Sequence, residues 1–102
     1  MIPSANQDKG EASLKGIITV LGKDKVGIIA KVCTYLADNN VNILDISQTI
    51  VQDYFNMMMI VDISLAEKSF EVLVEELHHA GEEIGVEIKL QHEDIFNIMH
   101  RI

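Results

Sequence analysis

The order in which hydrophobic patterns follow one another constrains this chain more than any other feature. From Leu14 onward, four short segments are β-branched or alternate apolar with polar residues, and two longer segments repeat apolar residues at helical spacing. The first pattern is typical of strands and the second of amphipathic helices. In chain order, the segments predict strand, helix, strand, strand, helix and strand.

The four predicted strands are short and are bounded by turn residues. They are KGIITVL at 15–21, VNILDISQTIV at 41–51, YFNMMMIVDIS at 54–64 and VEIKLQ at 86–91. The third carries apolar residues on both faces, with Met57 and Met59 on one face and Met58 and Ile60 on the other, which indicates a central strand. The second alternates apolar with polar residues, which predicts a half-buried strand.

The first helix is predicted over Ile28–Asp38, where apolar residues form a stripe along one side. The Asn39–Asn40 pair predicts its end, because asparagine tolerates the left-handed backbone found there. The second helix is predicted to start near Leu65, because Ser64 and Glu67 match the S-x-x-E capping box. Its apolar face comprises Phe70, Leu73, Val74, Leu77 and Ile84.

This order predicts an α+β fold of the ferredoxin-like βαββαβ type, with two helices on one face of a four-stranded antiparallel sheet. The length of 102 residues indicates one domain, which we assign to residues 14–91. Residues 1–13 form a polar leader that we expect to be disordered. In residues 92–102, apolar side chains recur at helical spacing and predict a short amphipathic C-terminal helix.

The second face of the predicted sheet is also apolar in its central strands. Because two helices cover only one face, we expect a second copy of the chain to cover the other, assisted by the C-terminal helix. The alternative is that this helix alone covers the face of its own chain. The pattern therefore predicts a homodimer.

The formal charge of −8 excludes several classes of partner. Binding to nucleic acid or to an anionic membrane needs clustered Lys and Arg, and Arg101 is the single arginine of the chain. No apolar run approaches the about 20 residues that span a bilayer. The single Cys33 cannot form an internal disulfide. We therefore expect a cytoplasmic protein that binds neither nucleic acid nor membrane.

No cofactor, metal site or catalytic set is expected. The four histidines lack a recognised zinc spacing, and the methionines at 57–59 are interpreted as core residues. No nucleophile with an adjacent base and no carboxylate pair stands out. We therefore do not expect an enzyme.

The loop GKDKVGI at 22–28 joins the first strand to the first helix. A nucleotide-binding P-loop needs Lys and Ser or Thr after its second glycine, whereas Ile28 and Ile29 follow Gly27. The loop also lacks the arginine of an acylphosphatase and the Cys-x-x-Cys of a metallochaperone. What remains is a helix N-terminus, whose unpaired N–H groups and dipole favour a carboxylate.

The stretch GKDKVGIIAKVCTYLADNNVNILDISQ resembles the start of an ACT domain, a small regulatory module that often binds amino acids at dimer interfaces. The resemblance is carried by the Asp24-x-x-Gly27 turn, the helix Ile28–Asp38 and the segment Asn40–Ile43. It covers about residues 14–90. The stretch ISQTIVQDYFNMMMIV and the tail are similar to stand-alone ACT proteins related to the glycine-cleavage regulator.

The resemblance implies a ligand site shared between two subunits. In ligand-binding ACT domains, the loop before the first helix and the asparagine that opens the second strand of a neighbouring subunit together hold the amino acid. Carried over by position, the site comprises Asp24, Val26, Gly27 and Ile28 of one subunit with Asn42 and Ile43 of the other. The helix amides would bind the α-carboxylate, and oxygens of Asp24 and Asn42 would accept from the ammonium.

Three of these residues also have a purely structural interpretation. Gly27 could serve close packing of the helix on the sheet, Asp24 could cap the helix, and Asn42 could bond a neighbouring loop. Two functions are therefore expected. The first is a regulatory homodimer that binds an amino acid or related metabolite and signals to a partner protein. The alternative is a dimerisation and protein-interaction module without a small-molecule ligand.

Overall fold

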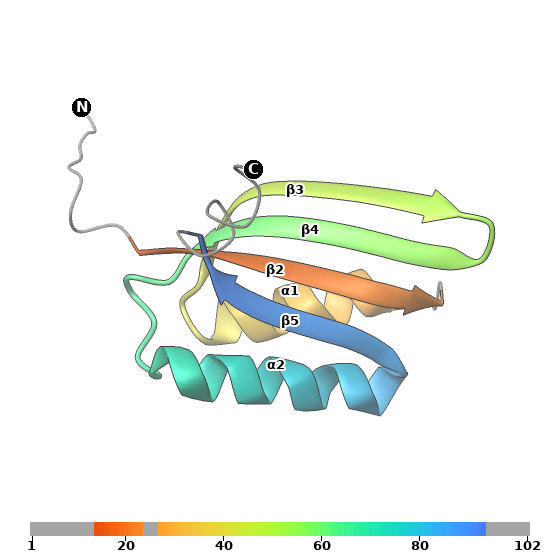
Figure 1. Cartoon of the computed structure of the whole chain (residues 1–102). Coiled ribbons are helices and arrows are strands. Elements are labelled where there is room, and N and C mark those ends of the chain that lie inside the picture. The colour runs from red at the N-terminus through yellow and green to blue at the C-terminus, as the bar shows by residue number, and fades with distance from the viewer. Residues whose placement is uncertain (1–13, 24–26, 94–102) are drawn as a thin grey trace.

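The computed structural model describes residues 14–23 and 27–93. In these residues it contains four strands and two helices in the predicted order (Figure 1). They are β2 (Lys15–Lys23), α1 (Ile28–Asp38), β3 (Asn42–Val51), β4 (Tyr54–Asp62), α2 (Phe70–Ile84) and β5 (Val86–His92). Both helices lie against one face of the sheet (Figure 1), which confirms the predicted ferredoxin-like α+β fold.

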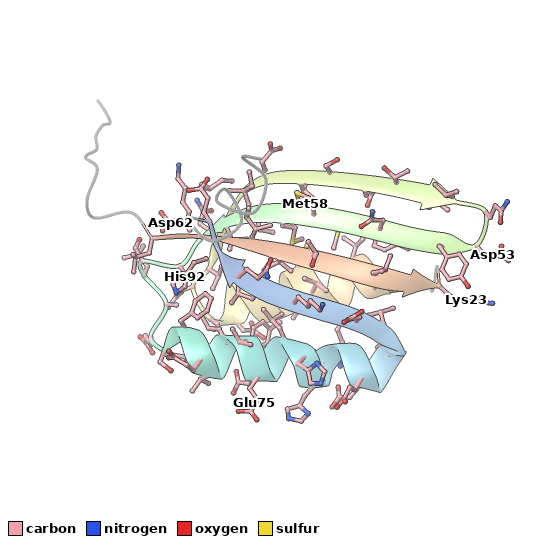
Figure 2. The ribbon with its side chains drawn as sticks, in the orientation of Figure 1. Lys23, Asp53, Met58, Asp62, Glu75 and His92 are labelled. Carbon is pink, nitrogen blue, oxygen red and sulfur yellow. The ribbon has the colours of Figure 1, made fainter. Side chains whose placement is uncertain are left out.

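β4 is a central strand, as predicted. The strand order is β3-β4-β2-β5, and all neighbouring strands are antiparallel. Met57 and Met59 are fully buried on the face that the helices cover, where they pair with Val20 and Ile18 of β2. Met58 points to the opposite, open face of the sheet (Figure 2) and is 38% exposed. The core of the domain therefore lies between the sheet and the two helices.

α1 runs from Ile28 to Asp38, the range that the sequence predicts. Ile28, Val32 and Leu36 are buried, and their spacing of four residues places them on the side of the helix that meets the sheet. Asn40 follows the helix with a φ of 60°. This left-handed conformation confirms that the asparagine pair ends the helix.

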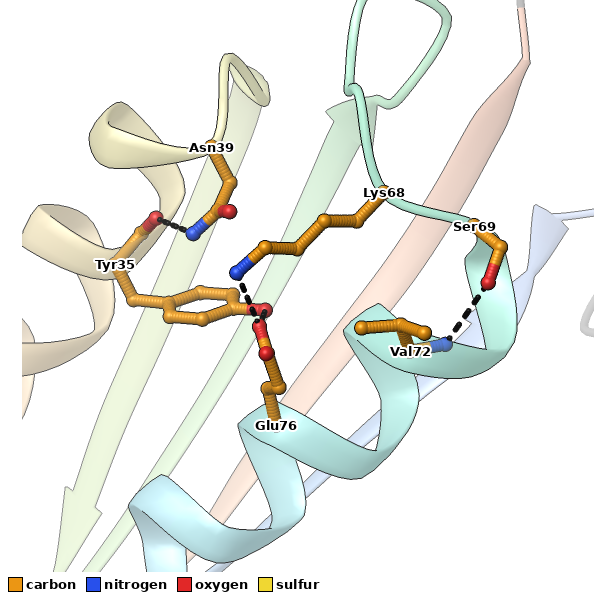
Figure 3. Close-up of polar contacts among 6 residues, drawn as sticks. All are labelled: Tyr35, Asn39, Lys68, Ser69, Val72 and Glu76. Carbon is orange, nitrogen blue, oxygen red and sulfur yellow. Dashed lines mark hydrogen bonds and ion pairs between the residues drawn. The ribbon is translucent and has the colours of Figure 1, made fainter.

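α2 begins at Phe70, well after the predicted start near residue 65, so the capping-box prediction was wrong. The hydroxyl of Ser64 donates to Oδ1 of Asp62 at 2.7 Å, and the Ser64 N–H donates to the same oxygen at 2.9 Å. Ser64 therefore closes the turn after β4 instead of capping a helix. The helix is capped by Ser69, whose hydroxyl accepts from a backbone N–H of the first turn at 3.3 Å (Figure 3).

β3 is an edge strand and is far more exposed than predicted. All of its residues except Ile43, which is partly buried, are exposed. Ile46 and Ile50 point to the helix side, because they pair with buried residues of β4, yet they are 44% and 54% exposed. A register shift between Ile43 and Asp45 marks a β-bulge near the start of the strand. The expectation of a half-buried strand was therefore wrong for a single chain.

The two predicted terminal segments fall largely outside the described residues. These are the polar leader over residues 1–13 and residues 94–102 of the predicted C-terminal helix. β5 continues through His92, the first residue that we assigned to that helix. No helix in the described part of the chain is both long and apolar enough to cross a membrane. Within residues 14–23 and 27–93, no three His, Cys, Asp or Glu side chains come together as metal ligands.

Candidate ligand site at the two ends of helix α1

Gly27 precedes α1 with a left-handed backbone, at φ 91° and ψ 0°. This conformation is strained for any residue with a side chain, which favours glycine. A Cβ atom added to Gly27 would meet no described atom within 4 Å. Gly27 is therefore not required for close packing on the sheet, and the packing interpretation was wrong. No described atom fills the space beside it.

The first turn of α1 presents backbone N–H groups that have no acceptor within the helix. The first helical bond runs from the N–H of Lys31 to the carbonyl oxygen of Gly27 at 2.9 Å. No acidic side chain lies in this turn, so no carboxylate within it offsets the helix dipole. Ile28 is buried and anchors the turn to the core. The arrangement suits a carboxylate. Asp24 and Val26 lie outside the described residues.

Asn42 and Ile43 lie at the opposite end of α1. The helix has 11 residues, and at 1.5 Å per residue it spans about 16 Å. β3 begins at Asn42, where the chain returns after the helix, and Asn42 pairs with Asp62 of β4. Within one chain, the two predicted halves of the site are therefore kept apart by the length of α1 (Figure 1).

A shallow depression of about 590 Å³ lies beside Asn42. It is lined by Asn40, Val41, Asn42, Asp62 and Leu65. The sequence-based site did not include Asp62 or Leu65. Asp62 comes to lie beside Asn42 through the register of β3 against β4, and that register cannot be read from the periodicity of either strand.

A polar cluster fixes α1 against α2 (Figure 3). The Tyr35 hydroxyl donates to Oε1 of Glu76 at 2.7 Å, and the Lys68 ammonium donates to the same oxygen at 2.8 Å. Burial, then the hydrogen bond to Glu76 and its charge, raise the pKa of Tyr35. Hydrogen bonds from Lys68 and from Tyr35 lower the pKa of Glu76. A second bond between the helices, from Lys31 to Glu83 at 2.8 Å, lowers the pKa of the Glu83 carboxyl.

Comparison with known proteins places these features in a family. Residues 16–91 match the ACT domain family. A UPF0237 protein of Bifidobacterium longum is 61% identical over 88 residues, which cover 86% of this chain and 98% of the relative. An ACT domain protein from Streptococcus pneumoniae has a similar solved structure, with a TM-score of 0.73 and 43% identity, over 82% of this chain and 94% of that chain.

A more distant solved structure shares the fold. It is a putative glycine cleavage system transcriptional repressor, with a TM-score of 0.66 and 21% identity, over 78% of this chain and 45% of that chain. The family match includes both ends of α1 and all of the described sheet except Lys15 and His92. The chain therefore belongs to the ACT domain family of regulatory proteins and is a relative of the UPF0237 proteins within it.

Proposed function

We propose that this chain is a regulatory homodimer that binds an amino acid, or a related zwitterionic metabolite, between its two subunits. The observation that carries the proposal is the separation of Gly27 from Asn42 by the full length of α1. A site that uses both residues needs two chains. Membership of the ACT family supports this function, because dimerisation and ligand binding are typical of that family.

Antiparallel pairing of β3 with the same strand of a second copy, in place of the contact over the open face that the sequence suggested, would bring the two halves to one end of the assembly. β3 runs from Asn42 at one end of the sheet to Val51 at the other. Val51 and Lys23 both pair with Tyr54, so β3 ends level with β2, from which the chain leads to α1. In a two-fold pair, Asn42 of one subunit would face Val51 of the other, at the end where that subunit's α1 begins.

The exposed surface around β3 supports this mode of pairing. β3 lies at the edge of the described sheet (Figure 1), where an outer row of N–H and C=O groups has no strand partner. Ile46 and Ile50 add apolar surface on the helix side, and Ile29 of α1 is 38% exposed. Burial of such surface contributes about 25 cal/mol for each Å². A second copy would form hydrogen bonds with the N–H and C=O groups of this edge and would cover the apolar surface at the same time.

In the proposed site, different groups of the protein bind the carboxylate and the ammonium of the ligand. The amides at the start of α1 would bind the carboxylate, and each charge-assisted hydrogen bond contributes about 1.5–3 kcal/mol. The side-chain oxygen of Asn42 would accept from the ammonium, and Asp24, Val26 and Ile43 complete the proposed site. A few such contacts give affinities in the micromolar to millimolar range. That range suits the sensing of an abundant metabolite.

The proposed output is a change in the orientation or stiffness of one subunit relative to the other. Such a change follows only if the ligand binds the two states with different affinity. A partner protein that contacts both subunits would then detect the liganded state. We place this activity in the cytoplasm, in keeping with the free Cys33.

Sedimentation combined with a thermal-shift screen of the standard amino acids tests the proposal. We expect a dimer at micromolar concentration and a higher Tm with at least one amino acid, because a ligand of the folded state stabilises it. A dimer that responds to no amino acid would favour the alternative function, a protein-interaction module without a small-molecule ligand. A monomer under all these conditions would contradict both.

A further inference from the structure

We infer that Asp62 binds the ammonium group of the ligand and that Leu65 contacts its side chain, so that the site selects an amino acid with an apolar side chain. The inference rests on the proposed function and adds two residues to that site. Its basis is the depression of about 590 Å³ beside Asn42, which both residues line.

Asp62 is oriented to accept from a cation. It lies opposite Asn42 in the antiparallel ladder, so both side chains leave the same face of the sheet, with Cβ atoms about 5 Å apart. Its Oδ1 accepts the N–H and the hydroxyl of Ser64, at 2.9 and 2.7 Å, which hold the carboxylate in one orientation. Among the described residues, Oδ2 makes no hydrogen bond, and in the inferred site it accepts from the ammonium.

The charge of Asp62 gives it a role that Asn42 cannot fill. An ammonium that loses water binds most strongly to a carboxylate, whereas the amide oxygen of Asn42 carries no formal charge. Among the described residues that line the depression, Asp62 is the one carboxylate. Lys15 is its neighbour across β2 and β4, but the two form no ion pair within 4 Å in the part of the chain that the structure describes.

Leu65 gives the depression an apolar side. It is 78% exposed, the highest value among the exposed large apolar side chains of the described residues. A single exposed leucine needs no explanation, but this one borders a hollow that also holds a carboxylate and two asparagines. An apolar ligand side chain would remove Leu65 from water, whereas a charged one would lose its own hydration.

Calorimetric titration with leucine, valine, methionine, serine, aspartate and lysine tests the inference. Asp62→Asn removes the charge but keeps an oxygen that can accept from Ser64. Glu75→Gln makes the same carboxylate-to-amide change on the exposed side of α2, away from β3 (Figure 2), and is the matched control. Leu65→Ser tests the apolar contact separately, so the inference does not depend on the folding of one variant. The Tm of each ligand-free variant shows that it is folded.

We expect leucine, valine or methionine to bind more tightly than the three polar amino acids. Asp62→Asn should weaken this binding at least about tenfold, since it removes a charged hydrogen-bond partner, and Glu75→Gln should leave it within about twofold. Leu65→Ser should reduce the preference for apolar over polar amino acids.

Three results would overturn the inference. If an amino acid binds the wild type and both site variants equally well, Asp62 and Leu65 are not part of the site, while the proposed function stands. The same holds if Asp24→Asn, and not Asp62→Asn, abolishes binding. If no amino acid of the full standard set binds the wild-type dimer, the proposed function fails and the inference fails with it.

Discussion

The hydroxyl of Tyr35 on α1 donates a hydrogen bond of 2.7 Å to Oε1 of Glu76 on α2 (Figure 3). The two residues are 41 positions apart in the chain, and this partly buried bond joins the two helices directly. Lys68, in the segment before α2, donates to the same oxygen at 2.8 Å. This contact orients the helix whose two ends carry the halves of the proposed ligand site.

Tyr35→Phe is expected to lower the free energy of unfolding by about 0.5–1.5 kcal/mol, because it removes one partly buried hydrogen bond and little volume. Urea denaturation measures the change. Tyr54→Phe is the matched control, since Tyr54 is 53% exposed and its hydroxyl has no hydrogen bond among the described residues. Equal losses in the two variants would show that the contact with Glu76 adds nothing to stability.

Glu76 should make the stability of the folded protein depend on pH. Hydrogen bonds from Lys68 and from Tyr35 hold the pKa of Glu76 below its ordinary value of 4.5 in the folded state. The unfolded chain therefore takes up this proton at a higher pH than the folded chain does. The resulting stability is present above pH 4.5 and is lost as the pH falls through the folded pKa.

Between about pH 5.5 and pH 3, the Tm of the Glu76→Gln variant should therefore fall less than the Tm of the wild type. Glu75→Gln is the control, because Glu75 is exposed (Figure 2) and forms no ion pair within the described residues. Its Tm should fall with pH as steeply as that of the wild type. The account of Glu76 is contradicted if all three proteins lose Tm in parallel.

Gly81 lies inside α2 where the helix meets the start of β5. A Cβ atom there would lie 2.6 Å from the carbonyl oxygen of Val86 and 3.0 Å from Cγ1 of Ile88. Because a backbone oxygen cannot move aside alone, Gly81→Ala should lower the free energy of unfolding by about 1–3 kcal/mol, despite the higher helix propensity of alanine. A more stable Gly81→Ala protein in chemical denaturation would refute this packing argument.

Gly27→Ala provides a contrast that separates backbone strain from lack of space. Its Cβ meets no described atom within 4 Å, but its φ of 91° should cost about 1–2 kcal/mol. Gly27→Asn should recover part of this loss, since asparagine tolerates the left-handed conformation. If alanine and asparagine destabilise equally in denaturant titrations, the left-handed backbone is not the reason for glycine at this position.

Ile46→Lys should weaken the proposed dimer at least about tenfold, because it places a charge on the apolar surface of the β3 edge. Sedimentation velocity over a range of concentrations measures the dissociation constant. Val72→Lys is the matched control, as Val72 on α2 is 41% exposed and Ile46 is 44% exposed. Met58→Lys changes the open face instead. If Met58→Lys dissociates the dimer and Ile46→Lys leaves its dissociation constant unchanged, the interface lies on the open face, which contradicts pairing through β3.

Periodicity predicted the elements whose burial follows from their own sequence. The stripe through Ile28, Val32 and Leu36 gave the bounds of α1, and the apolar residues on both sides of Met57 and Met58 identified β4 as central. These patterns succeed because an element that packs on one core must repeat its apolar residues at its own helical or strand period. The ACT resemblance read from the same residues agrees with the family match.

The failed predictions concern features that depend on neighbours. Ser64 matches a capping box, but its N–H and its hydroxyl both donate hydrogen bonds to the carboxylate of Asp62. Ile46 alternates as a buried residue would, yet neither described helix covers its side chain, which is 44% exposed. Asp62 joins the candidate site only through the β3–β4 register. A local pattern records what a residue favours, whereas competing partners and register decide what it contacts.

A subunit-mixing experiment tests the central claim, that one ligand site is built from two chains, most directly. Gly27→Asn fills the space in front of the α1 amides, and Asn42→Ala removes the opposite half of the site. Each variant alone should fail to bind the amino acid that stabilises the wild type. After joint unfolding and refolding in equal amounts, half of the dimers are mixed, and each mixed dimer holds one intact site and one site that lacks both halves. Calorimetry should then recover about a quarter of the wild-type sites. No recovered binding in a mixture that has formed mixed dimers, or full binding by either variant alone, would contradict the two-chain site.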